Sequence, residues 1–406
     1  MTNQTHSRKY PGQFWLMFAG LIFSTTGTTM IWPFLMIFVS ERLALPFTAV
    51  TSLMTIKAVV GLAASLLAGS VVDRFGRKWV MVLGLIGNGL VYFLMSDAQS
   101  YLQFALLMAL GGIFSPMYRV GTDAMLADMF KPEKRADAYA LMRMGRNIGV
   151  ALGPAVGGFV LSISYTIGLY AGAAGLGIYG LFVLLFMRET LRQTSKTSSS
   201  SLREQFAGYI YAFKDGVFMR LVGGFTLVQI CAMLVWVLLS VYLKLNFGIP
   251  EKVYGWIPTT NAVIIILFQV LITRWTKKFK VPAVLVVGST FYALSMLIIS
   301  LSSGLYGFWL AMVVMTIGEL ILMPTVSAFV ANLAPADKRG RYMSIYGLTW
   351  NVATGTGPLA AGILSDQFGL RAPWIAGIGV GLTSVIAFLR LGHRKARSDS
   401  DPRDGS

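Results

Sequence analysis

The chain has 406 residues, of which 55% are hydrophobic and only 13% are charged, and its mean hydropathy is +0.67. A soluble domain averages about 25% charged residues, so this composition lacks much of the charge that a water-exposed surface requires. Apolar stretches of about 20 residues, the length that crosses a bilayer, recur along the chain. Because these stretches do not alternate between polar and apolar residues, they predict helices and exclude a membrane barrel.

Residues that support covalent or metal-dependent chemistry are scarce. There is one cysteine, Cys231, and the two histidines, His6 and His393, lie near opposite ends of the chain. These numbers exclude an intrachain disulfide and a histidine-based metal or catalytic site. The chain also lacks a G-x-x-x-x-G-K-[ST] phosphate loop and a G-x-S-x-G nucleophile elbow. We therefore expect neither an enzyme nor an ATP-driven pump, and we expect no metal and no cofactor.

Twelve apolar segments predict twelve transmembrane helices in an all-α membrane protein. The first segment is long enough to span and has no small-residue cleavage site, so we expect it to be retained as a helix. The predicted segments are 13–39, 47–72, 79–96, 101–128, 138–161, 165–187, 219–245, 253–274, 281–300, 304–332, 340–363 and 371–391.

Lysine and arginine are distributed unevenly among the connections between these segments. With the N-terminus inside, 26 of the 34 basic residues fall in inside segments, and only Arg42, Lys244, Lys252 and Arg371 lie outside. This bias follows the positive-inside rule and predicts two cytoplasmic termini. We expect a multi-pass protein of the plasma membrane, which is the inner membrane in bacteria. The net charge of +17 then reflects topology, and nucleic acid is not an expected partner.

One long polar connection divides the chain into two halves. It contains the run SKTSSSS and has no spanning pattern, which is typical of a flexible linker. We expect an N-terminal six-helix bundle at 1–188, a cytoplasmic linker at 189–218, a C-terminal six-helix bundle at 219–391 and a disordered cytoplasmic tail at 392–406.

The two predicted bundles are related by a shift of 204 residues, without a gap. Parallel repeats of this kind imply a pseudo-two-fold axis along the membrane normal, with substrate bound between the halves near the midplane. The shift superposes Gly20 on Gly224, Trp32 on Trp236, Gly84 on Gly288, Arg135 on Arg339, Asn147 on Asn351, Gly153-Pro154 on Gly357-Pro358 and Gly158 on Gly362.

Two motifs carry a resemblance to the major facilitator superfamily that extends over all twelve segments. Residues 69–78, GSVVDRFGRK, match that family's G-x-x-x-D-R-x-G-R-[RK] motif between helices two and three. Residues 149–158, GVALGPAVGG, resemble the G-x-x-x-G-P-x-x-G-G motif of its drug/proton antiporters. The resemblance implies alternating access driven by an ion gradient, usually of protons. In the second half, residues 273–282, TRWTKKFKVP, keep the positive charge but lose the aspartate and the glycine.

The first motif predicts a gate at the cytoplasmic ends of the helices. Asp73 falls at a helix end, where it could cap a neighbouring helix or pair with an arginine. Asp128 is placed to hold Arg77. Either these charges latch the two halves together in the outward-open state, or they only set topology and cap helices. The expected gating residues are Gly69, Asp73, Arg74, Gly76, Arg77 and Asp128.

The second motif gives the fifth helix a smooth side, because small residues permit close helix contact. It has either a packing role alone or a distinct role in antiport. Its residues are Gly149, Gly153, Pro154, Gly157 and Gly158.

Ionisable residues within the apolar segments are candidates for function, because charge is expensive at membrane depth. Glu319 lies deepest in the second half and is our first candidate for proton coupling, with Asp123 as a second. The alternative for Glu319 is a neutral, hydrogen-bonded residue that fixes helix packing. Asp123 should lie at the depth of Arg143, so we expect these two side chains to pair.

The first half carries more buried positive than negative charge. Its arginines either make structural hydrogen bonds with the backbone and Asn147, or they receive an anionic substrate group. Tryptophan and amide side chains complete the expected cavity, although each alone could be a packing or interfacial residue. The expected substrate-cavity residues are Trp32, Lys57, Arg119, Arg143, Arg146, Asn147, Gln229, Trp236, Asn261, Trp350 and Asn351.

Together these features favour a secondary transporter that works by proton-coupled efflux of amphipathic small molecules. A carrier of an anionic metabolite or lipid-like substrate is the alternative, and a membrane receptor or scaffold without transport activity is a third possibility. The expected partners are a small-molecule substrate and the lipid bilayer, the energy source is a proton gradient, and we expect a monomer.

Overall fold

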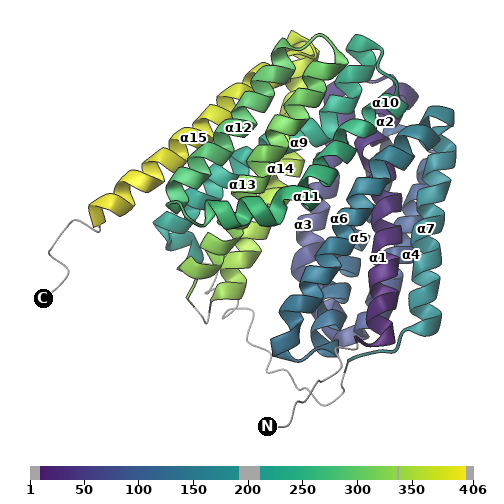
Figure 1. The fold of residues 1–406 in the computed structure, drawn as a ribbon. Helices are drawn as coiled ribbons and strands as arrows, with labels where there is room; N and C mark the ends of the chain where they lie inside the picture. Colours follow the sequence, from purple (N-terminus) through teal and green to yellow (C-terminus); the bar gives the residue numbers. More distant parts are fainter. Residues whose placement is uncertain (1–9, 192–210, 336–337, 399–406) are drawn as a thin grey trace, which may run out of the picture.

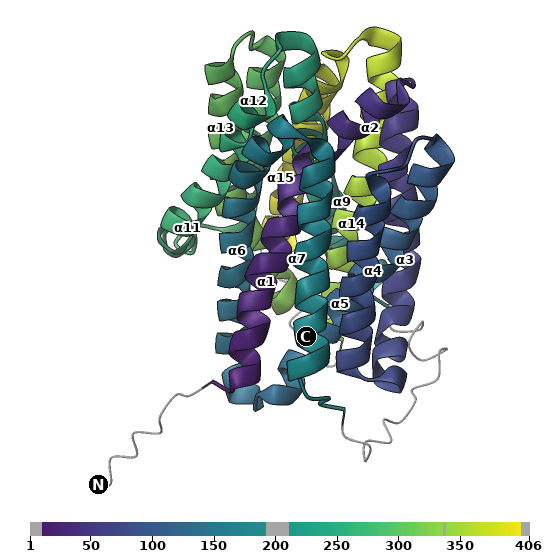
Figure 2. The same cartoon turned by 90° about the vertical axis from the view of Figure 1, so that its right-hand side faces the viewer.

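The computed structural model describes residues 10–191, 211–335 and 338–398, and among these it contains helices but no strand. Figures 1 and 2 show long helices that run in roughly the same direction and form one elongated body. In chain order they are α1 (Gly12–Ile31), the 3-10 turn η1 (Trp32–Phe34), α2 (Leu35–Leu43), α3 (Phe47–Phe75), α4 (Arg77–Met95), α5 (Tyr101–Met129), α6 (Pro132–Ile163), α7 (Tyr165–Phe186), α9 (Gly216–Phe247), α10 (Glu251–Tyr254), α11 (Trp256–Thr276), α12 (Val281–Leu301), α13 (Leu305–Leu333), α14 (Arg339–Phe368) and α15 (Ala372–Ser398).

These helices confirm the predicted twelve-helix membrane fold. Within the described ranges, eleven spans are long and apolar enough to cross a bilayer. The twelfth, α14, has 30 residues and is long enough, but it is richer in polar side chains. Several boundaries differ from the prediction by a few residues, and the largest differences are that α6 already begins at Pro132 and that α15 continues past Leu391 to Ser398. Residues 192–210 of the predicted linker and 399–406 of the predicted tail lie outside the described residues, whereas residues 392–398 of the predicted tail belong to α15.

Local sequence signals account for several helix ends and breaks. Pro33 lacks a backbone N–H and would clash in a regular helix, and the first crossing changes to a 3-10 turn at this point. Ser100 and Gln103 form a reciprocal capping box that begins α5. The Asp215 carboxylate accepts backbone N–H groups in the first turn of α9, at 3.0 Å.

The 204-residue repeat has a direct structural counterpart at the contact between the halves. From the first half to the second, the Thr55 hydroxyl of α3 donates a hydrogen bond to the carbonyl oxygen of Gly355 in α14, at 2.5 Å. From the second half to the first, the Thr259 hydroxyl of α11 donates a hydrogen bond to the carbonyl oxygen of Ala151 in α6, at 3.2 Å. The offset of 204 relates both donors and both acceptors, so two symmetry-related helix pairs join α1–α7 to α9–α15.

The two ends of the molecule differ, and we name them by their residues. The basic end carries Arg74, Arg77 and Lys78 between α3 and α4, and Arg274 and Lys277 after α11. The opposite end is the sealed end, where α2 meets α3 and α9 meets α10. Figure 1 shows the helices of the two halves converging at the sealed end and diverging toward the basic end.

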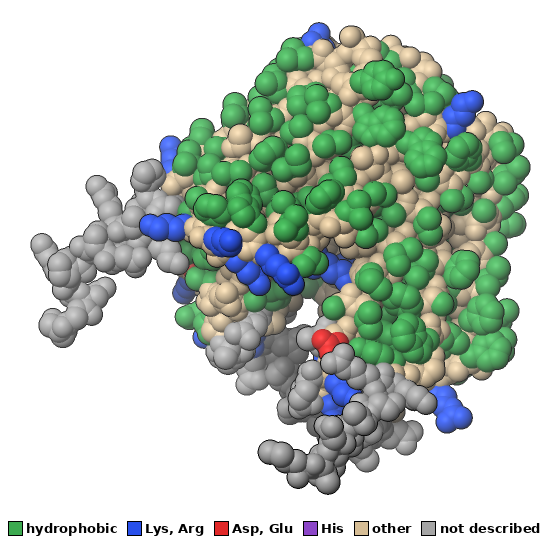
Figure 3. All heavy atoms as spheres, viewed as in Figure 1, with side chains coloured by type: hydrophobic (Ala, Val, Ile, Leu, Met, Phe, Trp, Pro, Cys, Tyr) green, Lys and Arg blue, Asp and Glu red, His purple; other side chains and the backbone are tan. Residues whose placement is uncertain are grey.

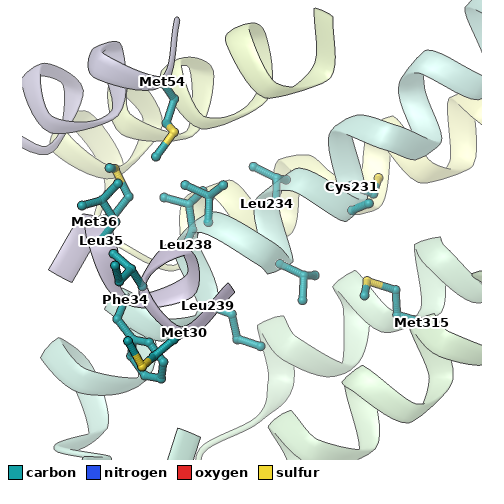
Figure 4. Packing of buried hydrophobic residues seen from close by; sticks show 14 of the residues in the cluster. Met30, Phe34, Leu35, Met36, Met54, Cys231, Leu234, Leu238, Leu239 and Met315 are labelled. Atoms are coloured by element: carbon teal, nitrogen blue, oxygen red, sulfur yellow. The ribbon is translucent and has the colours of Figure 1, made fainter. Parts of the chain in front are cut away.

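An apolar cluster closes the space between the halves near the sealed end. Buried side chains of α1, η1, α2 and α3 pack with buried side chains of α9, as Figure 4 shows. The contact lies where the first crossing is broken at Pro33, so the break lets the chain present apolar side chains to the other half. The cluster includes Met30, Phe34, Leu35, Met36 and Met54 from the first half and Leu234, Leu238 and Leu239 from the second.

Candidate functional site

Charged side chains inside the membrane-spanning part of α5 and α6 indicate where water reaches the protein. Arg119 and Asp123 of α5, and Arg143 and Arg146 of α6, are all exposed although they lie within apolar spans. Exposed charge at this depth must face a water-filled cavity and not lipid. Figure 3 shows a recess between the two halves at the basic end. The space between the halves is therefore open toward the basic end.

Lys57 of α3 projects into a cavity in the first half. Its Nζ lies 4.4 Å from the centre of the Trp32 ring, within cation–π distance. Two adjoining cavities of about 300 and 260 Å³ share Trp32, Lys57 and Ser115 in their walls. Trp350 and Asn351 of α14 line the smaller one together with Arg119. The structure thus brings five of the predicted cavity residues into one region that both halves contribute to.

Glu319 of α13 lies in the second half and is held by an amide. Asn261 of α11 donates from Nδ2 to Glu319 Oε2 at 3.0 Å and to the Thr316 hydroxyl at 2.9 Å. Asn261 is buried, whereas Glu319 is half-buried. Arg143, on the other half, interacts electrostatically with the Glu319 carboxylate. The two ionisable groups thus lie within electrostatic range of each other although they belong to different halves.

Asp123 belongs to a separate charged group in the first half. Its carboxylate interacts electrostatically with Arg146 and Arg119. The expected pair with Arg143 is not formed, since no ion pair joins these two residues in the described part of the chain. Equal depth does not decide the partner, because Arg143 is within electrostatic range of Glu319 and Tyr346, which both belong to the second half.

Three other predicted cavity residues have different surroundings. Gln229 is buried in α9, and its Oε1 has no hydrogen-bond partner among the described residues. Trp236 is half-buried and packs against the apolar core, as does its symmetry mate Trp32, but Trp236 lines neither of the two cavities that contain Lys57. Asn147 is half-buried in α6. The pseudo-symmetry of the sequence therefore does not extend to the walls of the Lys57 cavity.

The charged motif at the basic end is arranged around Arg77. Its guanidinium lies 3.2 Å from Asp73 and 3.0 Å from Asp128, so the contact expected between Arg77 and Asp128 is present. All three residues belong to the first half. Gly69 is exposed, and Arg74 lies over the Phe75 ring.

The helix cap in this motif comes from a residue that sequence reasoning missed. The Glu189 carboxylate, which follows α7, accepts the backbone N–H groups of Arg77 and Lys78 at 3.0 Å each. A carboxylate at a helix N-terminus is favourable, because it satisfies free N–H groups and complements the helix dipole. Gly76 has a φ of +97°, which favours glycine, and a Cβ there would collide with Glu189. Glu189 and not Asp73 therefore caps α4.

Replacing Glu189 by alanine should lower the thermal stability of the purified protein. Two backbone N–H groups would lose their acceptor, and loss of a cap costs about 1 kcal/mol. Thermal unfolding in detergent would measure the change. Asp137→Ala is a matched control, because Asp137 is also an exposed acid near the basic end. Equal melting temperatures for Glu189→Ala and Asp137→Ala would show that the cap does not contribute to stability.

The glycine motif of α6 contacts two different partners. Gly149, Gly153 and Gly157 face α1, where a Cβ on any of them would meet atoms of α1 at 3.0 Å or less. Gly158 instead faces the second half, where a Cβ would lie 2.6 Å from the carbonyl oxygen of Glu251 in α10. Pro154 also lies at this contact, against Gly255. The motif therefore packs within the first half and between the halves.

The offset of 204 also applies to the Gly158 contact. Gly362 of α14 lies against the start of α3, where a Cβ would be 2.9 Å from Thr48 Cα and 3.1 Å from the carbonyl oxygen of Phe47. Gly158 corresponds to Gly362 and Glu251 corresponds to Phe47. Glycine thus permits the same close approach on both sides of the pseudo-two-fold axis.

Polar contacts close the sealed end, and no motif in the chain predicts them directly. The Asp366 carboxylate of α14 accepts the backbone N–H groups of Phe47 and Thr48, at 2.8 Å each, and so caps α3 of the other half. This resembles the Glu189 cap in chemistry, but it joins the two halves.

A second polar contact at the sealed end is a network around Lys244 of α9. Its Nζ lies 2.5 Å from carboxylate oxygens of Glu41 in the first half and Glu251 in the second. Tyr165 of the first half donates a hydrogen bond to Glu251. In the sequence, Lys244 is recognisable only as a basic residue outside the membrane. Its short distance in the chain from Glu251 is the one sequence feature that indicates this ion pair.

Comparison with known proteins agrees with this architecture. The sequence matches the profile described as Major Facilitator Superfamily over residues 17–245 and again over 221–405. It is 28% identical to a Na(+), Li(+), K(+)/H(+) antiporter of Planococcus maritimus, over 90% of each chain. It is 24% identical to the quinolone resistance protein NorA of Staphylococcus aureus (strain MRSA252), over 79% of this chain and 81% of that protein.

A solved structure supports the same fold. A bacterial homologue of the human lysosomal transporter Spinster, in an inward-facing and unoccupied conformation, superposes with a TM-score of 0.79. The superposition covers 95% of this chain and 98% of that chain, at 14% sequence identity. Because the family profile covers nearly the whole chain, the protein belongs to the major facilitator superfamily and is a multi-pass membrane transporter, not an enzyme.

Proposed function

We propose that the protein is a proton-coupled exporter of amphipathic small molecules that works by alternating access. The observation that carries this proposal is Glu319, an ionisable residue within an apolar span that accepts a hydrogen bond from Asn261 and lies within electrostatic range of Arg143 of the other half. Charge at membrane depth is rare and points to function. A carboxylate at the contact between two moving halves can bind a proton on one side of the membrane and release it on the other.

The orientation of the protein follows from its charge. Most lysine and arginine residues fall at the basic end, so we place this end in the cytoplasm. The closed sealed end and the recess at the basic end then correspond to an inward-open state. In this state a substrate enters from the cytoplasm, and breaking the contacts at the sealed end releases it outside.

Two relatives support the choice of antiport and efflux. One is named as a cation/H(+) antiporter and the other as a quinolone resistance protein. The cavity around Lys57 combines tryptophan rings with polar groups, which suits molecules that have both apolar and polar parts.

Transport into proteoliposomes with an imposed pH gradient tests the proposal. We expect uphill movement of at least one amphiphile from a panel of cationic, neutral and anionic compounds. A protonophore should abolish the uphill movement, and liposomes without protein are the control. Uphill transport that survives the protonophore would overturn proton coupling, and the absence of transport for the whole panel would overturn the substrate class.

A gating prediction concerns Asp73 at the basic end. Its side chain is 59% exposed, and the ion pair that it forms within the described ranges is with Arg77 of its own half, so it can bind the second half when this end closes. Asp73→Asn should therefore destabilise the closed state of the basic end and increase the inward-open population. Spin labels at exposed Lys131 and Lys278, in a Cys231→Ala background, would report the distance between the halves.

Asp137→Asn is the control for this measurement, because it removes an exposed acid near the same end of the first half. Identical distance distributions for Asp73→Asn and Asp137→Asn would mean that Asp73 only supports the local structure and sets topology.

A further inference from the structure

Lys57 carries a positive charge into a cavity whose walls contain no acidic residue, whereas Arg119 interacts electrostatically with Asp123 outside the wall. Two basic side chains, Lys57 and Arg119, line the two parts of this cavity, and neither part has an acidic residue in its wall. No ion pair or hydrogen bond joins Lys57 Nζ to another side chain among residues 10–191, 211–335 and 338–398, where its close contact is with the face of the Trp32 ring. A lysine within the membrane normally finds a counter-charge. None of the described side chains supplies one to Lys57.

The rest of the wall is suited to an organic anion. The Tyr118 hydroxyl in the larger part has no hydrogen bond of normal geometry with a described residue, so it can donate to a ligand. The hydroxyl groups of Ser24, Thr28 and Ser115 also line this part, but they already donate to Leu21 O, Ser24 O and Asn88 Oδ1. Hydroxyl and ammonium groups are the donors that a carboxylate or phosphate accepts.

Aromatic rings surround the same space and can contact an apolar body. Trp32 and Tyr92 lie in the larger part, and Trp32 and Trp350 lie in the smaller one. The volumes of about 300 and 260 Å³ adjoin at Lys57, and together they fall in the range of small-molecule sites. A ligand could place its anionic group at Lys57 and its ring system against the tryptophans.

We propose that this cavity is an anion subsite that selects substrates with one carboxylate or phosphate group on an aromatic body, the group binding to Lys57. The inference rests on the proposed transport function and narrows its substrate class. It also separates the two charged regions of the protein, because the anion binds in the first half and the proposed proton site, Glu319, lies in the second. The expected selectivity is therefore set by Lys57 and not by Glu319.

Binding to the purified protein in lipid nanodiscs tests the subsite. The probes are 2-naphthylacetate, its neutral amide, the cationic 2-naphthylethylamine and 2-naphthyl phosphate, and calorimetry measures each affinity. We expect the anions to bind at least about tenfold more tightly than the amide or the amine, as for one charge-assisted hydrogen bond. The two anions distinguish a carboxylate site from a phosphate site. Equal affinities for 2-naphthylacetate and its neutral amide would overturn the proposal.

Variants at Lys57 locate the effect. Lys57→Gln should weaken anion binding by about tenfold and leave amide binding unchanged, whereas Lys57→Arg should retain the preference. Lys57→Met, which keeps the length of the side chain, serves if the glutamine variant does not fold. Lys278→Gln is the matched control, because it removes an exposed charge at the basic end. Undiminished anion preference in both Lys57→Gln and Lys57→Met would overturn the assignment.

The outcome can be separated from that of the proposed function. If anions bind through Lys57 but a pH gradient drives no uphill transport of them, the subsite stands and proton coupling fails. If a pH gradient drives transport of cationic or neutral amphiphiles and Lys57→Gln changes no affinity, proton coupling stands and the anion subsite fails.

Discussion

Glu319→Gln is expected to abolish uphill transport driven by a pH gradient while substrate binding is retained. Glutamine keeps the shape of the side chain and the contact with Asn261, but it cannot exchange a proton. Substrate affinity should stay within about twofold of the wild type, since only the coupling step is lost. Downhill movement of substrate along its own gradient would then continue without a pH effect. Transport in proteoliposomes and binding in nanodiscs measure the two quantities separately.

Asp97→Asn is the matched control for Glu319→Gln, because Asp97 is an exposed acid at the sealed end and has no place in the cavity. Asp123→Asn tests the second candidate for the proton site in the same assay. If Glu319→Gln transports uphill as fast as the wild type, Glu319 only fixes the packing of α11 and α13. A loss in Asp123→Asn alone would transfer the coupling role to the first half.

The second large effect is expected at the sealed end, where Gly158→Leu should prevent closure. A Cβ at this position would lie 2.6 Å from the Glu251 carbonyl oxygen and 3.2 Å from Lys252 Cα, and the rest of the leucine side chain adds further bulk. Overpacking costs about 1–3 kcal/mol, which displaces an equilibrium between two states by roughly 5- to 150-fold. The inward-open population should fall, and transport should decrease with it. The labels at Lys131 and Lys278 would report a shorter distance.

Two glycines provide contrasts for this variant. A Cβ added at Gly177 of α7 would have no atom within 4 Å, so Gly177→Leu should leave conformation and transport unchanged. Gly153 faces α1 of its own half, so Gly153→Leu should lower the thermal stability of the protein and leave the inward-open population unchanged. An unchanged distance distribution in Gly158→Leu would show that the glycine motif does not control closure of the sealed end.

Much of the fold is predictable from the chain because it depends on local properties. The length and apolar character of each segment determine that it crosses the membrane, and lysine and arginine counts bias its orientation. The shift of 204 residues predicts a two-fold relation between the halves, and the hydrogen bonds of Thr55 and Thr259 follow that relation. Among the described residues, the contact of Arg77 with Asp128 was also expected and is present.

Several contacts could not be predicted because their partners are backbone groups, which every residue carries. Glu189 and Asp366 both accept backbone N–H groups at a helix start, and no side-chain pattern identifies such an acceptor from a distance in sequence. The choice between Arg143 and Arg146 as the neighbour of Asp123 depends on helix rotation, which depth alone does not fix.

Composition and spacing alone establish the twelve crossings, the repeat and the ionisable residues at membrane depth, because these are properties of each segment taken singly. The folded arrangement was needed to learn which end is sealed and which charges meet across the halves. It also placed Trp32 in the wall of the Lys57 cavity, whereas its symmetry mate Trp236 lines neither part of that cavity. The physical reason is that closure requires two helix surfaces to approach closely. Glycine at positions 158 and 362 permits this approach, but a glycine in the sequence does not show which helix will lie against it.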